Sequence, residues 1–155
     1  MTLIAQFAPT VVVDVANVMG ARADGWWRDR AGAALRLSRE VVSLAARGVP
    51  AERMPAGLPA PAGWVLVLEG QAREAASMLA GVPPAVRVVT APGSGDDAIV
   101  AAAASAASAA SAASAVADSA GEGACLVVTA DRELRRRCAE VGADVVGPGW
   151  LLSLL

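Results

Sequence analysis

The sequence predicts a three-layer α/β/α fold around a mostly parallel sheet of about five strands. Five short apolar runs, rich in Val, lack the polar alternation of a sheet with one solvated face. Helical patterns separate these runs, and this alternation gives parallel strands joined by right-handed crossovers. A chain of 155 residues, 55% of them hydrophobic, can bury a sizeable core, so we expect residues 1–155 to form a single domain.

Each expected element has its own signal along the chain. The strands are expected at residues 10–13, 64–68, 86–90 and 125–129, with a weaker one at 143–146. The helices are expected at residues 28–47, 71–79, 96–119 and 132–141. In the first helix, apolar side chains such as Leu35, Val41 and Leu44 share a face opposite the Arg residues. Gly81 and Pro83 end the second helix, and Gly142 ends the last. Residues 48–63, rich in Pro, Gly and Ala, are expected to form a surface loop.

The third expected helix contains a low-complexity segment at residues 101–117. Its Ser-Ala-Ala repeat places a serine at every third position, and three residues turn an α-helix by about 300°. The serines therefore drift around the helix and define no fixed polar face; they are Ser105, Ser108, Ser111 and Ser114. Ala is the strongest helix former, so we interpret this segment as a smooth helix without a site.

Neither a membrane span nor a secretory signal is expected. The uncharged run between Asp97 and Asp118 is long enough to cross a bilayer, but Ala and Ser supply little transfer free energy. The apolar run near the N-terminus has no basic residue before it and contains Asp14. We therefore expect a cytoplasmic protein. Cys125 and Cys138 are expected to be buried, reduced thiols, with a disulfide as the open alternative.

Missing residue types exclude whole classes of chemistry. The chain has no His, and all 13 basic residues are Arg, so it also has no Lys. These absences exclude a Ser-His-Asp triad, an HExxH zinc site, a Walker A lysine and a Schiff-base lysine. Carboxylates, thiols, hydroxyls and Arg remain. The net charge of −2 argues against a protein that coats nucleic acid generally, but it allows a local basic patch.

Carboxylates follow the expected strands at their carboxyl ends, where open parallel sheets bind ligands. Asp14 ends the first strand with no clear helix to cap, Glu69 ends the second, and Asp131 follows the fourth. Asp96 and Asp97 follow the third strand after a Gly-rich turn. An alternative interpretation is that Asp96 or Asp97, and likewise Asp131, caps a helix. Converging carboxylates repel one another unless a cation binds, and oxygen-only ligands suit Mg²⁺ or Mn²⁺. Such ions catalyse phosphodiester hydrolysis without His or Lys.

Three segments in this order resemble the NYN domain of the PIN-like nuclease group. Residues 13–18 resemble its opening DxxN strand motif, residues 95–99 its acidic motif at a helix start, and residues 127–134 its later strand-end motif. Residues 25–30 also resemble the matching segment of small actinobacterial members. Glu133 stands where Asp is commoner in the family.

The resemblance implies a PIN-like fold and a metal-dependent ribonuclease. Asp14, Asp96 and Asp131 correspond to its catalytic, metal-binding carboxylates, and Asn17 to a residue that orients Asp14 or contacts substrate. The acidic motif aligns with either Asp of its pair, so Asp97 is a second candidate ligand.

Cationic and aromatic residues follow the first strand, close to the proposed cleft. We expect Arg28 and Arg30 to bind phosphate and Trp26 to stack on an unpaired base. In the same segment, Arg22 is a further candidate for phosphate binding and Trp27 a further candidate for base stacking. The alternative is that one Trp packs against the sheet edge while the Arg residues form a solvated face. Residues 135–137, all Arg, are expected to be a solvated face of the last helix.

We therefore expect a Mg²⁺- or Mn²⁺-dependent endoribonuclease. Two alternatives stay open: a non-catalytic PIN-like module that binds RNA or protein, and a small-nucleotide phosphohydrolase. The haloacid-dehalogenase pattern of the latter needs an Asp where this chain has Ala16. The partners expected are an RNA substrate and no membrane, with a homodimer as an open alternative to the monomer.

Overall fold

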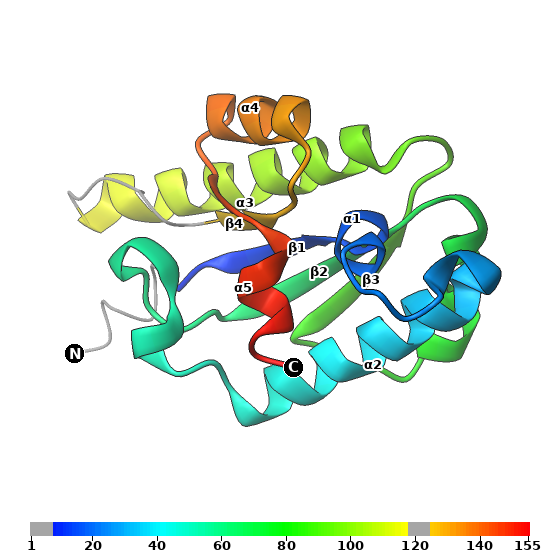
Figure 1. The fold of residues 1–155 in the computed structure, drawn as a ribbon. Helices are drawn as coiled ribbons and strands as arrows, with labels where there is room; N and C mark the ends of the chain where they lie inside the picture. Colours follow the sequence, from blue (N-terminus) through cyan, green and yellow to red (C-terminus); the bar gives the residue numbers. More distant parts are fainter. Residues whose placement is uncertain (1–7, 118–124) are drawn as a thin grey trace.

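The computed structural model describes residues 8–117 and 125–155, in which strands and helices alternate (Figure 1). The strands are β1 (Thr10–Asp14), β2 (Gly63–Leu68), β3 (Val86–Thr90), β4 (Cys125–Val128) and β5 (Asp144–Val146). The α-helices are α1 (Val15–Gly20), α2 (Arg30–Arg47), α3 (Gly95–Ala117), α4 (Arg132–Glu140) and α5 (Pro148–Leu152). The 3₁₀ helices are η2 (Trp26–Arg28), η3 (Ala51–Arg53), η4 (Pro55–Gly57) and η5 (Gly70–Leu79).

The strands form one parallel sheet in the order β3-β2-β1-β4-β5, which confirms the predicted fold class. β1 is central, and its Val13 is in register with Leu66 of β2 and Val128 of β4. Because parallel strands end at the same edge of a sheet, this order places the residues after β2, β1 and β4 side by side. The sheet topology therefore gathers the sequence-predicted carboxylates at one edge.

Helices cover both faces of the sheet and complete the three layers (Figure 1). Val11 and Val13 point to the face covered by α1, α2, η5 and α5, whereas Val12 points to the face covered by α3 and α4. Successive strand residues alternate between faces, and all three valines are fully buried. This explains why the strand sequence shows no polar alternation.

The structure corrects several expectations about the helices. Val15, Ala16 and Val18 continue the apolar pattern of the first strand, yet they belong to α1, and the side chain of Asp14 accepts a hydrogen bond from the Asn17 N–H. The expectation that Asp14 has no helix to cap is therefore wrong. η5 is a 3₁₀ helix where an ordinary helix was expected, and α5 was not expected at all.

The segment between α2 and β2 is only partly the surface loop that we expected. It contains η3 and η4, and the side chains of Val49, Met54 and Leu58 are buried against the α2 side of the core. These apolar residues hold the segment against the sheet, although its Pro and Gly content is typical of a loop.

The low-complexity segment is helical, as predicted. α3 begins at Gly95 and ends at Ala117, with Ser105 and Ser108 exposed. The side chains of Ser111 and Ser114 and the last two expected helical positions, 118 and 119, lie outside the described residues. None of the helices in residues 8–117 and 125–155 combines the length and apolar character that a bilayer crossing requires.

Both cysteines are buried free thiols, as expected. Burial raises the pKa of the Cys125 thiol to about 12 and that of the Cys138 thiol to about 11. Thiols with such pKa values carry almost no thiolate at neutral pH, so their role is packing on the α3 and α4 side of the sheet.

Candidate active site at the carboxyl edge of the sheet

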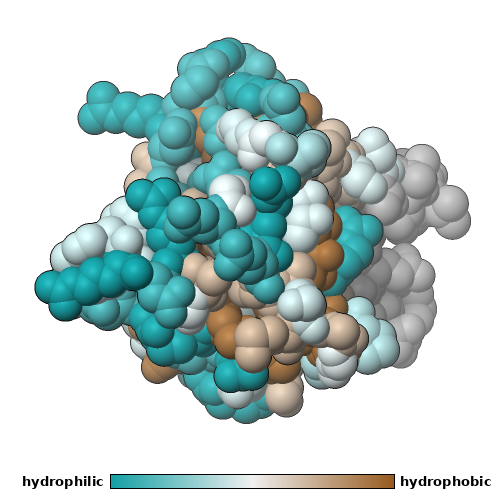
Figure 2. Space-filling model, turned by 90° about the vertical axis from the view of Figure 1, so that its right-hand side faces the viewer, coloured by the Kyte–Doolittle hydropathy of each residue, from teal (hydrophilic) through white to brown (hydrophobic). Residues whose placement is uncertain are grey.

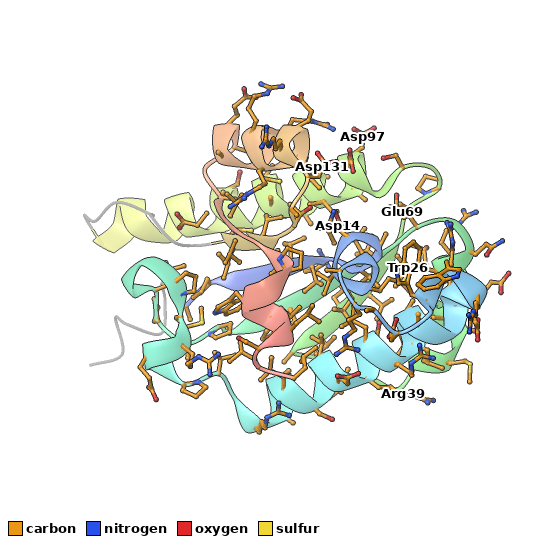
Figure 3. All side chains as sticks on the ribbon, in the orientation of Figure 1. Asp14, Trp26, Arg39, Glu69, Asp97 and Asp131 are labelled. Atoms are coloured by element: carbon orange, nitrogen blue, oxygen red, sulfur yellow. The ribbon has the colours of Figure 1, made fainter. Side chains whose placement is uncertain are left out.

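Four carboxylates lie at the carboxyl edge of the sheet. Asp14 ends β1, Glu69 follows β2 and Asp131 follows β4 (Figure 3). Asp96 lies in the first turn of α3. Desolvation is the largest cause of the raised pKa of both Asp14 and Asp96, and neighbouring charges add to it: Glu69 and Asp96 raise the pKa of Asp14, and Asp131 and Glu69 raise that of Asp96. Figure 2 looks onto this edge, which hydrophilic side chains largely cover.

Asp14 is the buried member of this group, with 6% of the residue exposed. Its Oδ2 accepts a hydrogen bond from Thr129 Oγ1 at 3.0 Å, and its Oδ1 accepts one from the Asn17 N–H at 3.3 Å. Burial raises its pKa to about 6, although both hydrogen bonds oppose that rise. Asp14 is therefore an acid that titrates close to neutral pH.

The loop after β4 is fixed by hydrogen bonds from the first strand and helix. Asn17 Oδ1 accepts a hydrogen bond from the Ala130 N–H at 2.8 Å. Thr129 is fully buried, and its Oγ1 accepts a hydrogen bond from the Asp131 N–H at 3.2 Å. Asn17 and Thr129 together set the position from which Asp131 enters the site.

Asp131 also has the capping role that the sequence offered as an alternative. Its Oδ1 accepts a hydrogen bond from the Leu134 N–H at 2.9 Å, at the N-terminus of α4. The residue is exposed, and Oδ2 makes no hydrogen bond with any described residue. One carboxylate oxygen thus holds the helix, and the other has no hydrogen-bond partner among the described residues.

Glu69 occupies the N-terminus of α3. Its Oε2 accepts a hydrogen bond from the Gly95 N–H, the first residue of that helix. A Cβ atom at position 95 would lie 3.0 Å from Oε2, so glycine permits the close approach. The helix dipole stabilises a carboxylate in this place. The N-termini of α1, α3 and α4 thus all lie against acidic side chains, and the helix dipoles offset part of the repulsion between these carboxylates.

The two adjacent acids at the start of α3 have different surroundings. Desolvation, then Asp131 and Glu69, raise the pKa of Asp96. Asp97 instead forms an ion pair with Arg137 at 2.8 Å, and its side chain is 88% exposed. Residues next to each other on a helix point about 100° apart, so one faces the acidic group and the other faces α4. Neither caps α3; Ser94 Oγ accepts the Asp96 N–H.

Other sequence-predicted residues lie outside the group. Glu133 forms an exposed ion pair with Arg136, which also pairs with Glu140, and Arg137 binds Asp97. Among the arginines of α4, Arg136 thus pairs within the helix and Arg137 pairs with α3, whereas Arg132 and Arg135 make no ion pair with any described residue. Arg22 is held by Glu40 through two hydrogen bonds of 2.9 and 2.7 Å.

The segment after α1 places aromatic and cationic side chains beside the acidic edge. Trp26 is partly buried against the core, with the Arg30 guanidinium 5.4 Å from its ring centroid. Arg28 lies 5.8 Å from the ring centroid of Trp27. Among the described residues, neither Arg28 nor Arg30 makes an ion pair.

A depression of about 230 Å³ connects this segment to the acidic edge. Arg30 and Glu69 both line it, with Ala16 and Met19 of α1 and the turns around Gly70 and Gly93. An anionic chain that approached the carboxylates along this depression would meet the Arg30 guanidinium.

The carboxylate oxygens at this edge are the type of ligand that suits a cation such as Mg²⁺, which keeps several waters as further ligands. Within the described residues, no three His, Cys, Asp or Glu side chains form a group that could hold a metal ion by themselves. Mg²⁺ commonly retains several waters and takes only one or two protein carboxylates. The free oxygen of Asp131, together with the neighbouring Asp96, suits such a site; each oxygen of Asp14, also expected as a ligand, accepts one hydrogen bond and keeps a second lone pair.

Two residues of the site were not among the catalytic, metal-binding or substrate-binding residues predicted from the sequence. Glu69 carries the same strand-end signal as the other acids, but it matches no motif of the resemblance. Thr129 stands in the strand-end motif, yet only the fold shows that its hydroxyl lies against Asp14.

Comparisons with known proteins support the fold. No protein-family model matches the chain, and no curated protein matches it in sequence. Among solved structures, the chain is similar to a mutant form of Rae1 (YacP) from Bacillus subtilis, with a TM-score of 0.54 and 14% sequence identity. The match covers 94% of this chain and 74% of that one. At this identity the similarity establishes a shared fold alone, here an α/β fold around a parallel sheet.

Proposed function

We propose that the protein is a Mg²⁺- or Mn²⁺-dependent endoribonuclease. The observation that carries the proposal is the group of four carboxylates at the carboxyl edge of the sheet, where desolvation and the charges of the neighbouring acids raise the pKa values of Asp14 and Asp96. A fold seldom keeps such repulsion at its ligand-binding edge unless a cation relieves it. The structural similarity to Rae1 supports the class of fold only, and the activity is argued from the site.

The chain's own residues have distinct roles in this proposal. Asp131 and Asp96 supply the accessible carboxylate oxygens, and Glu69 is a third acid beside them. Asp14, Thr129 and Asn17 are positioning residues, because their hydrogen bonds fix the loop that carries Asp131. A bound divalent ion would activate water and neutralise charge on the phosphate. Arg30 would bind the phosphate backbone within the depression beside Glu69.

One observation favours the alternative of a non-catalytic RNA-binding module. The acids form no ready three-residue cation site, and helix N-termini already satisfy several of their oxygens. In that case the depression and its arginine would bind RNA without cutting it.

Incubation with labelled single-stranded and structured RNA, in Mn²⁺ or in EDTA, tests the proposal. We expect cleavage in Mn²⁺ that EDTA and Asp131→Asn abolish, with Glu140→Gln, an exposed acid of the same helix, as the matched control. Cleavage that survives Asp131→Asn and Asp96→Asn would reject this site. RNA binding without cleavage by the wild type would favour the module, and phosphate released from free nucleotides would favour a phosphohydrolase.

A further inference from the structure

The most exposed aromatic side chain of the described residues lies beside the candidate active site. Trp27 is 56% exposed, whereas its neighbour Trp26 is partly buried against the core. The two rings meet edge to face, with centroids 5.9 Å apart and planes at 89°. Trp26 thus anchors a ring pair whose second member projects into solvent.

The backbone around the pair is well defined for so short a segment. Gly25 takes the left-handed conformation with φ of 78°, and its carbonyl accepts the Arg28 N–H at 3.0 Å to close η2. Asp29 then caps α2 through the Gly32 N–H at 2.9 Å. A rigid, exposed indole loses little conformational entropy when a ligand covers it.

The surrounding charges favour a polyanion over a protein as the ligand. Arg28 and Arg30 each lie over an indole ring and make no ion pair within the described residues. The nearby acids are occupied: Asp24 pairs with Arg36 at 3.5 Å, and Asp29 caps its helix. Arg30, which lies over the Trp26 ring, also lines the depression together with Glu69, so this arginine links the ring pair to the acidic edge.

We propose that Trp27 is a specificity-determining residue on which an unpaired RNA base stacks, while Arg28 and Arg30 bind the flanking phosphates. Aromatic rings stack on any unpaired base, whereas a base inside a duplex offers no free face. The site therefore selects single-stranded segments near the position of cleavage. This inference rests on the proposed function for its biological sense, but its binding step needs neither the metal nor catalysis.

Fluorescence anisotropy in EDTA tests the proposal with a labelled single-stranded uridine decamer and the same strand in a blunt duplex with an adenosine decamer. We expect the wild type to prefer the single strand. Trp27→Ala should weaken single-strand binding by about 5- to 150-fold and leave duplex binding unchanged. Trp27→Phe should restore most of the affinity. Met78→Ala, which removes a comparably exposed apolar side chain at the opposite end of η5 from Glu69, is the matched control.

Salt dependence separates stacking from charge. Trp27→Ala should keep the wild-type slope of log affinity against log salt concentration, whereas Arg28→Gln should reduce it by about one phosphate contact. Equal losses for single strand and duplex in Trp27→Ala, or no loss at all, would overturn the proposal. The proposal would also be overturned if the wild type bound no decamer and the Trp27→Ala variant had a different oligomeric state from the wild type, because the ring would then be a protein contact.

The same variants distinguish this failure from failure of the proposed nuclease activity. Single-strand binding that depends on Trp27, without cleavage in Mn²⁺, would support the stacking site and reject the nuclease. Cleavage that depends on Asp131, together with unaltered RNA binding by the Trp27→Ala variant, would support the nuclease and reject the stacking site.

Discussion

Thr129 Oγ1 donates a hydrogen bond of 3.0 Å to Asp14 Oδ2, joining two buried side chains 115 positions apart in the sequence. The same oxygen accepts the Asp131 N–H at 3.2 Å. One hydroxyl therefore couples the buried acid of the central strand to the loop that carries the exposed acid of the next strand. Together with Asn17, whose Oδ1 accepts a hydrogen bond from the Ala130 N–H, Thr129 fixes the geometry of the acidic edge.

Replacing Thr129 tests this coupling. Thr129→Val keeps the shape but removes the donor and the acceptor, so we expect the free energy of unfolding to fall by about 1–3 kcal/mol. The pKa of Asp14 should rise further, because the lost hydrogen bond lowers it in the wild type. Thr129→Ser retains the hydroxyl and should restore the pKa. Denaturant unfolding and NMR titration of the Asp14 carboxyl measure both effects, and a valine variant equal to the wild type would contradict the coupling.

The pKa of Asp14 predicts how stability depends on pH. Its folded value of about 6 lies above its ordinary value of 3.8, so the folded state binds this proton more tightly than the unfolded state. This group's contribution to stability is therefore present below pH 4 and is lost as the pH rises through 6. The difference corresponds to at most about 3 kcal/mol.

Asp14→Asn should abolish the loss of stability that occurs as the pH rises through 6. In the absence of divalent ions, we expect the variant to melt at a higher temperature than the wild type at pH 7.5, with the gap closing toward pH 4. Thermal unfolding followed by circular dichroism at several pH values measures it. A gap that does not change with pH would mean that Asp14 is not the titrating group.

The fold was predictable because its elements depend on local patterns. The Val-rich run at residues 11–13 is buried on both faces, and such a run indicates a central strand of a parallel sheet. α1 was missed because Val15 and Val18 continue the apolar pattern, and only the capping contact from Asp14 to Asn17 marks the change to a helix. α5 has only five residues, although Pro148 at its first turn is a helix-start signal.

The position of a site residue was predictable only where the sequence indicated which strands are neighbours in the sheet. That Asp14 and Asp131 are neighbours follows once β1 is central and β4 pairs with it. The choice between Asp96 and Asp97 depends on Arg137, which comes from another helix and draws Asp97 away. The role of Glu69 depends on the close approach of Gly95, a tertiary contact that no local pattern encodes.

Adjacent acids at the start of α3 should differ in function. Asp96→Asn should lower Mn²⁺-dependent RNA cleavage by at least about 100-fold, because it removes an accessible oxygen donor beside Asp131. Asp97→Asn should leave the rate close to that of the wild type, because this side chain pairs with Arg137 on the surface. Initial rates at saturating Mn²⁺ measure both. The reverse ranking would show that Asp97 is the ligand.

Divalent ions should stabilise the folded protein at neutral pH. A ligand that binds only the folded state adds about 2.7 kcal/mol at a concentration 100 times its Kd. Mn²⁺ should therefore raise the melting temperature of the wild type, and Glu69→Gln should weaken the effect by removing one charge. Glu140→Gln, also on the surface but away from the edge, should respond as the wild type does. Equal responses in all three proteins would assign the ion to another site.

Anomalous diffraction from crystals soaked in Mn²⁺ tests the central claim most directly. We expect one strong anomalous peak at the carboxyl edge, within bonding distance of Asp131 or Asp96 and completed by waters. Asp131→Asn crystals, soaked identically, should lose it. A wild-type crystal with no peak at this edge, or with its only peak beside Asp97 or Glu133, would contradict the claim that these four strand-end acids form a cation site.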